Sequence, residues 1–108
     1  MQQIPPHVLH TLERLASRNI ELVPLPGLER YFVLARDGFA SLVERTPRGF
    51  GRAGAAGLVT AQGFAALVWR EDIPWFVGKS FEFPAGQEQV ASIRRFTADL
   101  EQALSSGP

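Results

Sequence analysis

The sequence predicts an α+β fold: a two-layer sandwich in which an antiparallel sheet of five or six strands carries an N-terminal and a C-terminal helix on one face. Two observations support this class. Short apolar stretches separated by turn residues fill the middle of the chain, and amphipathic helical patterns occupy both ends. A third observation is a repeat, because residues 37–45 (DGFASLVER) return at 62–70 (QGFAALVWR), as though one hairpin were made twice.

Apolar residues at steps of three and four predict the two helices. The first is expected over residues 6–18 and ends at Asn19, a residue that tolerates the left-handed conformation of a helix stop. The second is expected over 87–104. Together with the strands between them, the helices form a single domain, residues 1–104, followed by a flexible tail at 105–108.

Six strands are expected, over residues 20–23, 31–35, 39–45, 58–61, 64–70 and 75–83. Asp37-Gly38 is the preferred dipeptide of a two-residue type I′ turn, and Gln62-Gly63 stands at the same place in the second copy. The repeat therefore assigns matching sheet positions to four pairs: Phe39 and Phe64, Ala40 and Ala65, Leu42 and Leu67, Val43 and Val68.

A competing assignment makes the Ala-rich stretch 52–69 a helix, which gives the order α-β-β-β-α-β-α. This helix would contain three glycines, Gly54, Gly57 and Gly63. Because an interior glycine costs a helix roughly 1 kcal/mol relative to alanine, and because of the similarity to 37–45, strands are favoured there.

Composition restricts the function. Eleven basic and eleven acidic residues give no net charge, so no overall field attracts nucleic acid or an anionic membrane, and neither is expected as a partner. The absence of cysteine excludes disulfides, thiolate metal sites and thiol catalysis. Because the N-terminus also lacks the pattern of a secretory signal, a cytoplasmic protein is expected.

The segment 46–57 is expected to be a flexible loop at one end of the sheet. It contains the pattern G-x-G-x-x-G after a strand, with arginines beside it, and backbone amides of such a loop can hold a phosphate. The residues that follow resemble a strand rather than a helix, so a simple connection between hairpins competes with anion binding. The candidate ligand-binding residues are Arg48, Gly49, Gly51, Arg52 and Gly54.

Catalytic and metal sites find little support. His7, His10 and Glu13 lie three apart on the first predicted helix and could ligate a divalent cation, but no fourth ligand can be named. Solvated polar residues beside an apolar stripe are the preferred interpretation. No catalytic residue, metal or cofactor is therefore expected, and the balance leans away from an enzyme.

Aromatic residues are the most informative candidates for function. In the last expected strand, Trp75 and Val77 point to the side expected to face a core, and Phe76 points to the other. Two end helices can cover only one face of the sheet, so aromatic residues of the other face either curl inward through sheet twist, which is the preferred interpretation, or remain exposed. An exposed apolar face usually marks a contact surface. The candidate interaction face contains Tyr31, Phe39, Phe64, Trp69, Trp75 and Phe76.

The resulting hypothesis is a non-enzymatic interaction or assembly module that binds a protein partner or associates with itself as a homodimer. The alternative is a small-ligand or phosphate-binding protein that uses the 46–57 segment. In architecture alone the order of elements resembles frataxin-like domains, although the acidic first helix of an iron-handling member is absent, since Glu13 is the sole carboxylate there. Type III secretion chaperones also place helices on a small sheet and dimerise, and the alternative helix over 52–69 would make the order of elements more similar to theirs.

Overall fold

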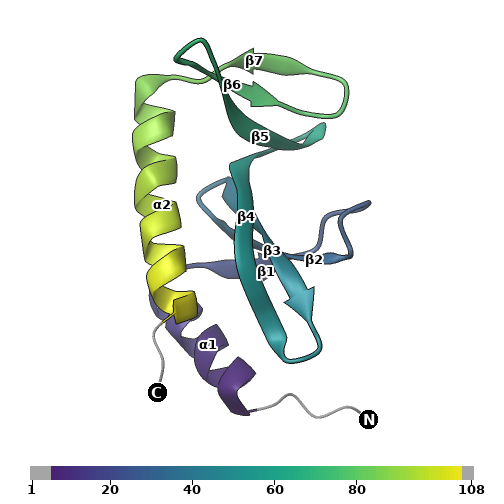
Figure 1. The fold of residues 1–108 in the computed structure, drawn as a ribbon, viewed down its shortest axis with the longest axis vertical. Helices are drawn as coiled ribbons and strands as arrows, with labels where there is room; N and C mark the ends of the chain where they lie inside the picture. The colour runs from purple at the N-terminus through teal and green to yellow at the C-terminus, as the bar shows by residue number, and fades with distance from the viewer. Residues whose placement is uncertain (1–5, 106–108) are drawn as a thin grey trace.

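A computed structural model describes residues 6–105 and shows the α+β layout, with one helix at each end of the chain and an antiparallel sheet of seven strands (Figure 1). The helices are α1 (Pro6–Ser17) and α2 (Gln87–Ser105). The strands are β1 (Glu21–Val23), β2 (Tyr31–Arg36), β3 (Phe39–Thr46), β4 (Gly49–Thr60), β5 (Gly63–Arg70), β6 (Ile73–Val77) and β7 (Glu82–Pro84). Each strand pairs with its neighbour in sequence, so the sheet is a meander from β1 to β7.

The chain ends are described only in part. Of the tail expected at 105–108, Ser105 is the last residue of α2, and residues 106–108 lie outside the described part. Within residues 6–105, no helix is long and apolar enough to cross a membrane.

The seventh strand arises because the expected strand 75–83 is broken by a turn. The N–H of Gly78 donates a hydrogen bond to the carbonyl of Phe81 at 2.8 Å, which closes the β6–β7 hairpin. The ring of Phe81 covers Gly78, where a Cβ atom would lie 2.3 Å from the ring. A side chain at this turn would have to displace the Phe81 ring. The chain reverses direction here, where the sequence suggested one continuous strand.

The end of α1 agrees with its prediction. Asn19 has a φ of 61°, and its N–H donates to the carbonyl of Ala16 at 3.0 Å. The N–H of Ile20 donates to the carbonyl of Leu15 at 2.9 Å, which completes the two-bond pattern of a Schellman motif. Leu15 and Ile20 are both buried in the core, so the helix stop also directs the chain into β1.

Both helices lie on one side of the sheet, as predicted (Figure 1). Most of the buried apolar residues form two clusters. The larger one contains Leu15, Ile20, Leu34, Val43, Phe96, Leu100 and Ala103, and the smaller one contains Ala65, Phe76 and Ile93. Since α2 contributes residues to both clusters, this helix holds together the β1–β3 and the β5–β7 parts of the sheet.

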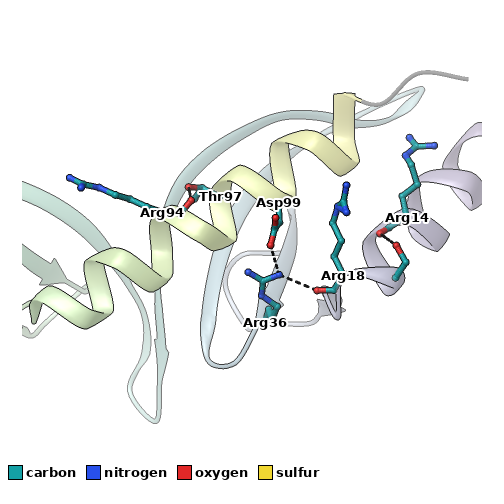
Figure 2. Close-up of polar contacts among 7 residues, drawn as sticks. Arg14, Arg18, Arg36, Arg94, Thr97 and Asp99 are labelled. Carbon is teal, nitrogen blue, oxygen red and sulfur yellow. Dashed lines mark hydrogen bonds and ion pairs between the residues drawn. The ribbon is translucent and has the colours of Figure 1, made fainter.

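Arginine side chains join β2 to both helical segments and the two helices to each other, and Figure 2 shows the contacts of Arg36. The Nη1 atom of Arg36, in β2, donates to Asp99 Oδ2 of α2 at 2.8 Å and to the carbonyl of Arg18 at 3.1 Å. Arg14 Nε, in α1, donates to the carbonyl of Ala103 at 2.9 Å, near the end of α2. These bonds satisfy carbonyls at helix ends, where no intrahelical donor is left.

The two copies of the sequence repeat do not occupy matching positions. Arg36 pairs with Phe39, which confirms the turn at Asp37-Gly38, but Thr60 pairs with Gly63, so the second turn lies one residue earlier than its copy suggests. Phe39 consequently packs on the helix side, whereas Phe64 faces away from the helices. A one-residue shift moves every side chain of a strand to the opposite face, and the expected equivalence is therefore wrong.

A threonine sets the position of the shifted turn. The hydroxyl of Thr60 accepts a hydrogen bond from the N–H of Gln62 and donates one to the carbonyl of Gly63, at 3.1 and 2.8 Å. Thr46 makes the same contacts around the β3–β4 turn. The duplicated turn is thus T-x-x-G, at 46–49 and 60–63, rather than the one in the longer sequence repeat.

Residues 46–57 do not form a loop, so that expectation is wrong. Most of the segment belongs to β4, which also replaces the alternative helix over 52–69. From Ser41 to Arg45 the register shifts twice, and each time β4 contains one residue more than β3 opposite it. These are β-bulges, near Gly54 and Gly51, and they explain the glycine content that had suggested a loop.

Gly57 marks the place where the sheet bends. A Cβ atom there would lie 1.9 Å from the carbonyl oxygen of Ala65 in β5, so no side chain can be accommodated. β5 pairs with β4 only between Gly57 and Thr60. From there, β5–β7 turn away from the direction of β4 (Figure 1).

We expect Gly57→Ala to destabilise the fold by about 3 kcal/mol, because the new methyl group displaces the backbone of β5. The matched control is Ala55→Val in the same strand, where the side chain is exposed and the change should stay within about 0.5 kcal/mol. Urea unfolding measures both. Equal stability of the two variants would contradict the contact at Gly57.

Arg36→Met should cost about 1–2 kcal/mol, since it removes the ion pair and also leaves the Arg18 carbonyl without its donor. Asp99→Asn should cost less, about 0.5–1 kcal/mol, because the carboxylate side of the pair is 42% exposed. Thermal and urea unfolding of the two variants test this order, and the reverse order would show that the carbonyl contact contributes nothing.

Candidate functional site

The sheet face opposite the helices is apolar along β4, β5 and β6. Cross-strand partners lie on the same face, and four such pairs point away from the helices: Val59 with Phe64, Ala66 with Val77, Val68 with Trp75, and Arg70 with Ile73. No helix lies on this side in Figure 1. Most of these apolar side chains are half-buried, so they still present surface to a partner.

The β5–β6 end of the sheet is the most exposed apolar part of this region. Trp69 is 51% exposed and Ile73 is 53% exposed, and both lie beside the turn that joins the two strands. Leu9 and Leu22 are the other large apolar side chains with comparable exposure among the described residues. Because Trp69 points to the helix side and Ile73 to the opposite side, this end is apolar on both faces.

The hairpin that carries these residues has a fixed shape. Its turn residues, Glu71 and Asp72, have φ angles of 51° and 65°, as in a type I′ turn. Ile73 was not among the sequence candidates, because it reads as part of the polar lead-in to the next strand. Its exposure follows from strand register, which no local pattern reveals.

Arginines flank both tryptophans. The guanidinium of Arg70 lies 5.7 Å from the ring of Trp75, and that of Arg94, in α2, lies 6.0 Å from the ring of Trp69. Arg70 also binds Glu82 through two hydrogen bonds of 3.1 and 2.9 Å. These bonds, followed by the charge of the arginine, hold the pKa of Glu82 below its ordinary value and raise that of Arg70.

The structure separates the six aromatic residues of the predicted interaction face. Tyr31, Phe64 and Trp75 lie half-buried on the helix-free face, and Trp69 is exposed on the helix side. Phe39 is half-buried against both core clusters.

Phe76 is completely buried, so its assignment to an exposed face is wrong. It lies opposite Leu67 and Phe83, and its ring is 5.4 Å from that of Phe83. The predicted alternation of this strand is inverted, with Phe76 rather than Trp75 in the core.

The candidate anion-binding residues do not form a phosphate loop. Arg48 lies in the β3–β4 turn, where its carbonyl oxygen is 2.6 Å from Nε2 of His7. Gly49, Gly51, Arg52 and Gly54 belong to β4 and lie alongside β3. A strand follows the motif where a phosphate-binding loop requires the start of a helix.

Of the predicted group His7, His10 and Glu13, His7 has a structural contact. Nε2 of His7 contacts the Arg48 carbonyl and so links the start of α1 to the β3–β4 turn. Across residues 6–105, no group of three or more His, Asp or Glu side chains is arranged to hold a metal ion.

The Arg70–Glu82 pair predicts a pH dependence. A carboxylate with a lowered pKa in the folded state adds stability above its unfolded pKa, and this contribution disappears as the pH falls through the lower folded value. Arg70→Gln should therefore raise the pKa of Glu82, measured from its carboxyl ¹³C shift. The stability difference between the two proteins should vanish in acid, and an unchanged pKa would contradict the pair.

Comparison of the chain with models of known protein families, with curated proteins and with solved structures finds no significant match.

Proposed function

We propose that the protein is a non-enzymatic interaction or assembly module whose contact surface is the β5–β6 end of the sheet. The observation that carries this proposal is the exposure of Trp69 and Ile73 at one hairpin end, next to Trp75. The two side chains lie on opposite faces of the same hairpin end, and exposed large apolar side chains gathered at one place on a folded domain usually mark a contact surface. The proposal places this module in the cytoplasm, as the cysteine-free sequence suggests.

The chemistry of this end favours a protein as the partner. Tryptophan and arginine are the residue types most enriched where protein interfaces gain their binding energy, and here each tryptophan has an arginine within 6.0 Å. The Arg70–Glu82 pair lies beside Trp75 and provides a polar rim. A rigid hairpin also loses little conformational entropy on binding.

A second copy of the chain is the partner to test first. A twofold dimer places the same patch on both sides of the interface, so each copy would cover the exposed Trp69 and Ile73 of the other. The tryptophans make this contact measurable, because both tryptophans of the chain lie at the proposed surface.

We expect the wild-type protein to sediment faster with increasing concentration, with a blue shift of tryptophan emission as the surface becomes covered. Ile73→Glu should weaken this association on the order of tenfold or more, because it places a charge in an apolar contact. The matched control, Leu9→Glu, changes an apolar residue of α1 that is 44% exposed and should associate like the wild type.

A wild-type protein that stays monomeric with constant emission would remove self-association. Equal behaviour of Ile73→Glu and Leu9→Glu in an associating protein would move the interface away from the β5–β6 end.

A further inference from the structure

A groove of about 490 Å³ lies at the opposite end of the sheet, between the β1–β2 connection and β2, with lining residues from both faces of the sheet. Apolar side chains make up most of its lining, among them Val23, Leu25, Leu28, Tyr31 and Val33. Although Val33 faces away from both helices, it is 2% exposed. The connection therefore covers this part of the face that the helices leave free.

The wall formed by residues 24–30 is held by its own hydrogen bonds. The N–H of Leu28 donates to the carbonyl of Leu25, and the N–H of Tyr31 donates to the carbonyl of Leu28, at 3.1 and 3.0 Å. Gly27, with a φ of 86°, donates its N–H to Glu29 Oε1 at 3.1 Å. These two turns preform the groove, which lowers the conformational cost of filling it.

Arg45 is the cationic residue in the lining of this groove. Its guanidinium carbon lies 4.1 Å from the ring centre of Phe32, a stacked position that leaves the N–H donors at the edge of the guanidinium plane free. Arg45 makes no ion pair with any residue in 6–105. Glu29 is the carboxylate in the lining, and hydrogen bonds from its own N–H and then from the Gly27 N–H lower its pKa.

We propose that this groove binds a small carboxylate with one apolar chain, of the type of a medium-chain fatty acid. The chain fills the space between the β1–β2 connection and β2, and the carboxylate accepts two hydrogen bonds from Arg45. The volume lies within the range of about 300–1,000 Å³ that is usual for small-molecule sites, and an apolar lining with few polar groups is typical of them.

The Arg45 guanidinium, which has no ion-pair partner among residues 6–105, favours an anionic ligand. A planar guanidinium with unused donors matches a carboxylate in both charge and geometry, and such charge-assisted pairs are about twice as strong as neutral hydrogen bonds. A cationic amphiphile would meet Arg45 with the same charge, and the Glu29 carboxylate with which it could pair already accepts the Gly27 N–H. A neutral alcohol of equal length would gain the apolar contact alone. This site does not depend on the β5–β6 surface, since the two share no residue.

Titration of the ¹⁵N-labelled protein with sodium decanoate, below its micelle concentration, tests the assignment. We expect amide shifts at Leu28 and Val33, with weaker binding of decanol and none of decyltrimethylammonium. Arg45→Gln should weaken decanoate binding by about tenfold and leave decanol binding unchanged. Arg45→Lys keeps the charge and should recover part of the affinity.

The matched control is Arg30→Gln. Arg30 stacks on Tyr31 at 5.6 Å but does not line the groove, so this variant should bind decanoate like the wild type. Absence of decanoate binding would overturn the proposal. So would equal affinity for decanol and decanoate, equal losses in Arg30→Gln and Arg45→Gln, or shifts confined to β5 and β6.

Discussion

The close approach of β5 to β4 at Gly57 is the constraint on which the rest of the structure depends. Because the Ala65 carbonyl occupies the space of a side chain there, β5–β7 can leave the direction of the long strand. The bend divides the core into two clusters that share α2. One helix of 19 residues, about 28 Å long, can reach both clusters from only one side of the sheet. The opposite face is therefore covered by no helix, and the β1–β2 connection covers only part of it.

The bend also creates a strand edge that needs protection. β5 pairs with β4 from Gly57 onward, so residues 49–56 have a strand on one side alone within the described part of the chain. Free edges invite pairing with other chains, and bulges are a common defence because they break the regular spacing of backbone donors. The two bulges of β4 lie in this segment. Contacts through side chains of β5 and β6 therefore agree better with this sheet than contacts through its backbone edge.

Local chemistry explains what the sequence could predict. The stop at Asn19, the turn at Asp37-Gly38 and both helices follow from residues within a few positions of each other, and all three predictions are confirmed. The first half of β4 could not be predicted, because bulges and small residues remove the alternation that identifies a strand. The prediction placed Phe76 on the wrong face of the sheet, which corresponds to a shift of one residue in strand register. Register depends on where each turn closes, and there a hydroxyl such as that of Thr60 decides between neighbouring positions.

For the candidate sites too, residue types along the chain are informative, whereas contacts that form only in the folded structure are not predictable from the sequence. Composition and the two end helices predicted aromatic residues on the helix-free face, and Tyr31, Phe64 and Trp75 do lie there, but alternation had placed Trp75 on the side of the core. The roles of individual arginines could not, because they depend on the nearest carboxylate in space. Arg36 and Arg70 lie over aromatic rings and also bind a carboxylate, so their charge is paired within the fold. Arg30, Arg45 and Arg94 lie over rings without an acidic partner among residues 6–105, so their donors remain available to a molecule from outside. This difference, rather than the number of arginines, singles out the two ends of the sheet as places where the protein can recognise something else.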